Sequence, residues 1–144
     1  MNTLIQYYIQ TTQWLDRVGM SLLILLMRCW MAKIFWFSGL TKINDWQTAL
    51  FLFAHEYKVP LIPSEIAAVL AVTAELTCPL LLVIGFATRF ATIPLLLMTA
   101  VIQFTYLNFI DHAYWTMLFA TILMYGPGVL SLDHLIKKKF FNNR

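Results

Sequence analysis

Four long apolar runs occupy most of this chain and constrain its fold more than any other feature. They cover residues 18–40, 66–87, 90–110 and 113–132. A membrane-spanning α-helix needs ~20 apolar residues to cross ~30 Å of hydrocarbon, which is the length of each run. Charged residues are only 12% of the chain, against ~25% in an ordinary soluble domain. We therefore predict an all-α integral membrane protein.

Short connectors between the runs predict how the helices are arranged. Thr88 and Arg89 separate the second run from the third, and Asp111 and His112 separate the third from the fourth. Helices joined by so few residues run antiparallel, so we expect a four-helix antiparallel bundle. Four membrane spans use most of the chain, and the remaining residues are enough only for connecting segments. We therefore expect residues 1–144 to form a single membrane domain.

Two segments outside the runs are expected to lie at the membrane surface. Residues 1–17 place apolar side chains near one helical face, with Trp14 as an interfacial anchor, which indicates an amphipathic N-terminal segment. In residues 44–58, Asp45 can serve as the N-cap of a short amphipathic helix. This helix would lie on the outer side, between the first and second spans.

Basic residues are unevenly divided between the two sides of the predicted bundle. One side carries only Lys42 and Lys58, whereas the other carries Arg17, Arg89, Lys137, Lys138, Lys139 and Arg144. Because cytoplasmic flanks are rich in Lys and Arg, we expect both termini in the cytoplasm, with the chain in the inner (cytoplasmic) membrane of a bacterium or archaeon. Topology and attraction to anionic lipids account for the net charge of +3, so no nucleic-acid partner is expected.

Two charged residues inside the runs suggest a buried polar site. Counted along the runs, Arg28 and Glu75 fall near the midplane on neighbouring antiparallel helices. Because an isolated charge there costs several kcal/mol, we predict that the two form an ion pair. The pair could fix the helix register or serve a function, and intramembrane ionisable groups favour the functional reading.

Other polar residues could extend this site. Arg28, Phe35 and Lys42 recur at seven-residue spacing, so they share one helical face. Gln103 and Tyr106, at i and i+3 of the third run, could add hydrogen-bonding groups to a cavity in the outer half of the bundle. Alternatively, they could form structural hydrogen bonds between helices. The candidate buried polar site therefore consists of Arg28, Glu75, Lys42, Gln103 and Tyr106.

Prolines and glycines mark two irregular points in the predicted helices. Pro79 lacks the N–H that would bond the Glu75 carbonyl, which predicts either a polar pocket or an ordinary kink. Residues 126–128, Gly-Pro-Gly, should break the fourth helix on its cytoplasmic side. Arg89 and Asp133 fall at the same interface, where we predict a second, structural ion pair.

The remaining reactive side chains do not form a recognisable cofactor site. His55, His112 and His134 all fall outside the predicted spans, so a bis-histidine haem between helices is not expected. No metal-ligand spacing is present, and no metal is predicted. Cys29 and Cys78 form no C-x-x-C motif, which favours packing over a redox pair.

An ordered set of residues resembles the DoxX family of small four-helix membrane proteins. The resemblance spans residues 18–135 and rests on Arg28, Phe35, Gly39, Lys42, Glu75, residues 82–85, Thr88-Arg89, Gly126-Pro127-Gly128 and Ser131-Leu132-Asp133. It implies a four-helix bundle. Relatives include the membrane subunit of archaeal thiosulfate:quinone oxidoreductase, a mycobacterial membrane partner of superoxide dismutase and a sulfurtransferase, and members of gene clusters that mature copper-binding peptides.

Two functions follow as hypotheses. The first is a membrane subunit of a quinone-linked redox complex, with an aromatic lining of Trp30, Trp36 and Tyr106 around the head group. The second is a non-enzymatic membrane anchor or transporter-like module for a partner protein, a small substrate or a modified metal-binding peptide. Without covalent cofactor ligands, the chain is at most an oxidoreductase subunit that needs a partner or a bound quinone. A protein partner or a homo-oligomer is expected in either case.

The predicted orientation can be tested by cysteine labelling. A cysteine introduced at Lys58 should react with a membrane-impermeant maleimide added to intact cells, whereas one at Asn142 should react only after lysis. The opposite labelling pattern would reverse the orientation.

Overall fold

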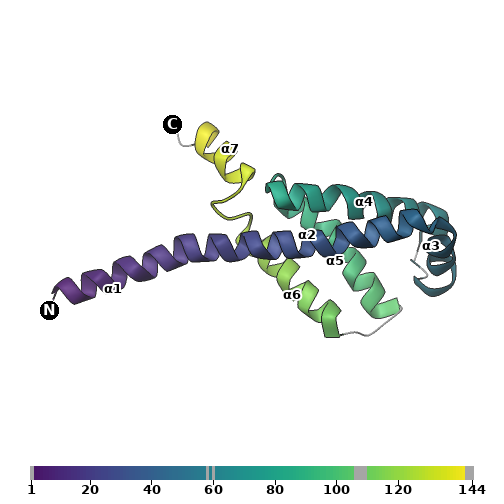
Figure 1. Ribbon diagram of the computed structural model, residues 1–144, viewed down its shortest axis with the longest axis horizontal. Helices are drawn as coiled ribbons and strands as arrows, with labels where there is room; N and C mark the ends of the chain where they lie inside the picture. Colours follow the sequence, from purple (N-terminus) through teal and green to yellow (C-terminus); the bar gives the residue numbers. More distant parts are fainter. Residues whose placement is uncertain (1, 58, 60, 106–109, 142–144) are drawn as a thin grey trace.

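The computed structural model describes residues 2–57, 59, 61–105 and 110–141, and within these residues every regular element is helical. The all-α prediction is therefore confirmed (Figure 1). In chain order the elements are α1 (Asn2–Trp14), the π-helical turn η1 (Leu15–Gly19), α2 (Met20–Asn44), α3 (Trp46–Leu52), a second π-helical turn η2 (Phe53–Tyr57), α4 (Ser64–Ile84), α5 (Thr88–Thr105), α6 (Ile110–Tyr125) and α7 (Leu132–Phe141).

Helices α2, α4, α5 and α6 pack together around an apolar core. Helix α2 contacts α4 and α6, and α5 contacts α4 and α6. Phe35 of α2 lies at the centre, with its ring edge-on to Phe119 at 5.4 Å and to Trp115 at 6.0 Å between centroids. Helices α2 and α4 are long and apolar enough to cross a membrane, and α5 is a shorter apolar helix. Outward-facing side chains such as Leu70 and Leu97 are apolar and exposed, as lipid contact requires.

The N-terminal segment continues α2 in line, whereas the sequence predicts a separate segment at the membrane surface. The backbone is α-helical at Trp14, Gly19 and Met20, so α1, η1 and α2 form a single rod (Figure 1). No proline interrupts residues 2–44. At 1.5 Å per residue the rod is ~64 Å long, about twice the hydrocarbon thickness, so α1 projects well beyond the packed helices.

The last of the packed helices is shifted toward the N-terminus from its predicted bounds. Helix α6 begins at Ile110, so Asp111 and His112 belong to its first turn and do not form the connector. It ends at Tyr125 because Gly126 and Gly128 adopt φ values of +90° and +75° on either side of Pro127. The predicted break is confirmed, and α7 is a separate helix.

The predicted short helix between the first two long helices is confirmed as α3. The Asp45 carboxylate accepts a hydrogen bond from Thr48 N at 3.1 Å, which is an N-cap. Hydrogen bonds from Thr48 hold the pKa of Asp45 below its ordinary value. Ala49 and Phe53 are buried, and Phe53 packs on Ala68 of α4.

Asp133 ties the C-terminal helix to the turn between α4 and α5. Its carboxylate accepts hydrogen bonds from Ala87 N at 2.8 Å and Thr88 N at 3.0 Å, and its own N–H donates to Gly85 O at 2.9 Å. A negative charge at these N–H groups is favourable because the N-terminus of a helix carries partial positive charge. Asp133 therefore caps α5 from a distant part of the chain.

Removing this cap should destabilise the fold. We expect Asp133→Ala to lower the free energy of unfolding by about 1–2 kcal/mol, because the α5 N-terminus loses two acceptors. Thermal unfolding in detergent measures the change. Asp16→Ala, at an exposed aspartate of η1, is the control, and equal losses in the two variants would contradict the capping role.

Candidate functional site

A buried ion pair joins Lys42 of α2 to Glu75 of α4. Lys42 Nζ lies 2.7 Å from Glu75 Oε1 and 2.9 Å from Oε2, and it donates to Ser38 Oγ at 2.8 Å. Ser38 Oγ in turn donates to Glu75 Oε1 at 3.1 Å. The side chains of Lys42 and Glu75 are only 13% and 2% exposed, so each charge depends on the other for compensation.

The predicted ion pair between Arg28 and Glu75 is wrong because the two residues lie at different depths. A Cβ added to Gly39 would lie 3.1 Å from Glu75 Cβ, so Glu75 is level with Gly39. Gly39 follows Arg28 by 11 residues, which is ~16 Å along a helix. The nearest cation on the same face of α2 at that depth is Lys42.

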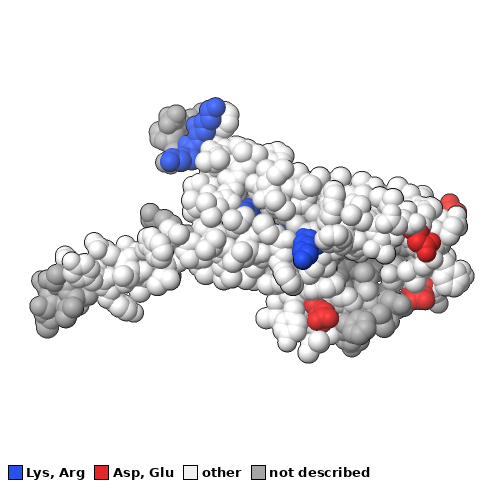
Figure 2. Space-filling view, viewed as in Figure 1, with Lys and Arg blue, Asp and Glu red and all other residues white. Residues whose placement is uncertain are grey.

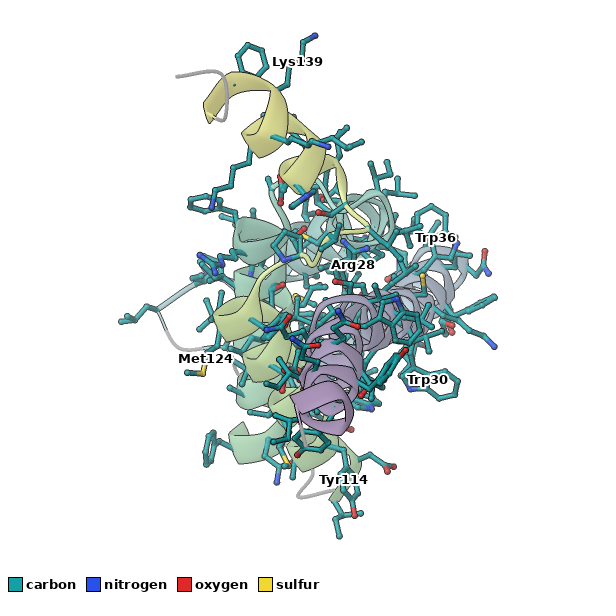
Figure 3. All side chains as sticks on the ribbon, turned by 90° about the vertical axis from the view of Figure 1, so that its left-hand side faces the viewer. Arg28, Trp30, Trp36, Tyr114, Met124 and Lys139 are labelled. Atoms are coloured by element: carbon teal, nitrogen blue, oxygen red, sulfur yellow. The ribbon has the colours of Figure 1, made fainter. Side chains whose placement is uncertain are left out.

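Arg28 is fully buried at the opposite end of α2. Its Nη2 donates to Leu130 O at 2.7 Å, while Nε and Nη1 have no hydrogen-bond partner among the described residues. Figure 3 shows Arg28 in the interior, beneath the segment that leads to α7. Arg28 and Phe35 are buried on α2, and Lys42, two turns beyond Phe35, is 13% exposed.

An apolar groove of about 390 Å³ runs between α4 and α5 to the ion pair. Lys42 and Glu75 supply its charged groups, and Phe53 and Tyr57 of η2 border it. Its walls include Leu70, Ala71, Ala74, Pro94, Leu97 and Met98. Leu70 and Leu97 are more than half exposed, so the groove is open toward the lipid-facing side.

Gln103, another predicted site residue, does not join this pair. Gln103 is not in the groove lining, and its Oε1 lies 3.0 Å from Nδ1 of His112 on α6. Tyr106 lies outside the described residues. The predicted ion pair of Arg89 with Asp133 is wrong, because Asp133 caps α5 and Arg89 donates to Met124 O at 3.3 Å.

The predicted aromatic lining is also displaced. Trp30 is 59% exposed and points away from the packed helices (Figure 3), and Trp36 borders a different surface hollow with Cys29. The groove takes its aromatic rings from Phe53 and Tyr57, whose i, i+4 spacing beside the helix at Trp46 was the available sequence signal.

The histidines, cysteines and carboxylates of the described residues do not gather into one cluster. Within the described ranges, no three His, Cys, Asp or Glu side chains are grouped so that they could hold a metal ion. Cys29 is exposed and Cys78 is buried, and both are free thiols.

Comparison with known proteins identifies the family of this chain. The described residues include two helices that are long and apolar enough to cross a membrane, as expected of a small helical membrane protein. The model of the DoxX family matches residues 23–108, and the chain belongs to this family. It is also similar to an uncharacterized protein of Haemophilus influenzae, with 30% identity over 135 residues that cover 85% of this chain and 89% of the relative. No solved structure matches the chain.

The energetic coupling of the pair can be measured with a double-mutant cycle. Lys42→Met and Glu75→Leu each leave one buried charge unpaired, so we expect each to cost about 3–5 kcal/mol of unfolding free energy. The double variant should cost clearly less than their sum, because it leaves no buried charge. Thermal and denaturant unfolding in one detergent measure this.

Lys33→Met is the control for loss of a lysine from α2, because Lys33 is exposed. Strict additivity of the two single losses would show that Lys42 and Glu75 do not interact.

Proposed function

We propose that this chain is the membrane subunit of a quinone-linked redox complex and that the quinone head group binds at the Lys42–Glu75 end of the groove. The observation that carries the proposal is a bonded ion pair at the end of an otherwise apolar groove. An isoprenoid quinone has the matching chemistry, with a polar ring and an apolar tail. Its bound form would supply two-electron, two-proton chemistry, with a protein partner exchanging the electrons.

The groove fits such a ligand in size and polarity. Its volume of about 390 Å³ lies within the range of small-molecule sites. The exposed Leu70 and Leu97 would contact the tail where the groove opens. A ligand of this kind can therefore enter sideways from the bilayer.

The ion pair can bond to either oxidation state of a quinone. Lys42 donates to both Glu75 oxygens, so one of these bonds can be exchanged for a bond to a quinone carbonyl. Glu75 Oε2 accepts from Lys42 alone among the described residues, which leaves it able to accept from a quinol hydroxyl. Glu75 is thus placed to hold the proton that a quinol releases.

In this proposal α2, α4, α5 and α6 cross the membrane as a four-helix antiparallel bundle with both termini in the cytoplasm. The charge distribution supports the orientation. Figure 2 shows basic side chains on α7, where Lys138 and Lys139 lie, and acidic side chains at the opposite end near α3. Such an excess of basic residues is typical of the cytoplasmic side of a bacterial membrane protein.

A second function, anchoring a partner protein, is favoured by α1. This helix projects from the packed helices (Figure 1), and Tyr7, Tyr8 and Trp14 are each more than 60% exposed. Exposed aromatic side chains are typical of protein interfaces. In this function the Lys42–Glu75 pair would fix the register of α2 against α4.

The proposal is tested by mass spectrometry of quinone that copurifies with gently solubilised protein. We expect Ala74→Phe, which fills the groove, to retain at least about tenfold less quinone than the parent chain. Val69→Phe introduces the same ring at an exposed position of α4 outside the groove lining and should retain the parental amount. Lys42→Met should also lose quinone, whereas Lys33→Met should not.

Thermal unfolding of each variant separates loss of ligand from loss of fold. If a folded Ala74→Phe variant retained as much quinone as the parent chain, the quinone would bind outside the groove. If the parent chain retains no quinone where a known quinone-binding protein does, the quinone-linked function is wrong and the anchoring function becomes the better explanation.

A further inference from the structure

A second hollow, separate from the groove, lies where α7 meets the α4–α5 turn and the end of α6. Its volume is about 580 Å³. Segments far apart in the sequence surround it, with Ser21 from α2, Arg89 from α5, Tyr125 from α6 and Lys137 from α7. None of its lining residues belongs to the Lys42–Glu75 groove.

The hollow gathers cationic groups from two helices. Arg89 lies against Gly126, where an added Cβ would come within 3.2 Å of its Nη2, and donates to Met124 O. This leaves other guanidinium N–H groups available to an anion. Lys137 is exposed at the same hollow, and His134 lies one turn before it on α7.

The one carboxylate in the lining does not cancel this charge. Both oxygens of Asp133 already accept N–H groups at the N-terminus of α5. The positive end of that helix compensates the carboxylate. The field available to a ligand is therefore set mainly by Arg89 and Lys137.

One wall of the hollow is apolar and exposed. Phe86 and Phe90 line it and are 44% and 78% exposed. Phe90 lies on α5, whose exposed face carries further apolar residues such as Ile93 and Leu97. A ligand that fits both parts has an anionic head beside Arg89 and Lys137 and an apolar chain along the phenylalanines.

We propose that this hollow binds the phosphate of an anionic phospholipid, with the acyl chains lying along Phe86 and Phe90. Free phosphate has the same head-group chemistry, but it would leave the apolar wall unused. The neighbouring lysines of α7, Lys138 and Lys139, would hold the helix near the same anionic surface without lining the site.

Native mass spectrometry with phosphatidylglycerol and phosphatidylcholine of equal chain length tests the proposal. We expect the parent chain to prefer phosphatidylglycerol. Arg89→Gln combined with Lys137→Gln should weaken that binding about tenfold or more, because two cations leave the site. Lys138→Gln combined with Lys139→Gln removes the same charge outside the lining and should keep most of the binding.

Three results would overturn the proposal. Equal losses in the two double variants would indicate diffuse attraction to α7. A parent chain without a phosphatidylglycerol preference would exclude a specific site. Displacement of the lipid by millimolar inorganic phosphate would make it a phosphate site.

Further variants keep the test independent of folding and of the quinone groove. Lys137→Gln alone changes only an exposed side chain and should still weaken binding. Phe90→Ser should reduce lipid retention without changing charge, and copurified quinone should stay at the parental amount in all these variants.

Discussion

The need to compensate buried charge organises this fold. Helix α2 carries two cations into the packed interior, and each is bonded to a different part of the chain. Lys42 is held by Glu75 and Ser38, whereas Arg28 donates a hydrogen bond to Leu130 O. In an apolar environment the loss of Glu75 would leave Lys42 without a counter-charge. The register of α2 against α4 is fixed accordingly, and Gly39 provides the close approach that brings Glu75 within reach of Lys42.

The same constraint explains the path of the C-terminal segment. After the break at residues 126–128, the chain passes over Arg28 and then docks on the α4–α5 turn through Asp133. Gly85 makes this docking feasible, because it has φ +74° and an added Cβ would collide with the Arg28 guanidinium and approach Ser131 Cβ to 2.6 Å. The turn, α7 and the Arg28 end of α2 therefore form one connected unit.

Some of this could be predicted from the sequence, for physical reasons that are easy to identify. Hydropathy predicted the apolar helices. Asp45 predicted the N-cap of the short helix α3, and residues 126–128 predicted the end of α6. Each of these signals depends only on neighbouring residues in the sequence. The partner of Glu75 was predicted wrongly because it depends on how far α4 is shifted along α2. An error of a few helical turns in that shift replaces Lys42 with Arg28 as the predicted partner. The bonds of Asp133 were not foreseen because their donors are backbone N–H groups, which carry no side-chain signature. Phe53 and Tyr57 border the groove because their short segment packs on α4, and their i, i+4 spacing alone did not show which helix that segment would contact.

The continuity of α1 with α2 has a mechanical consequence. Arg28 and Lys42 lie on one face of the same rod, ~21 Å apart along its axis, and α1 extends that rod away from the packed helices. If a bound partner rotated α1 about its axis, the rotation would be transmitted to α2 through the continuous helical backbone. The π-helical turn η1 is the one irregular step between the exposed end and Arg28 among the described residues. Beyond that step α2 is a single helix, so a rotation about its axis would move Arg28 and Lys42 together.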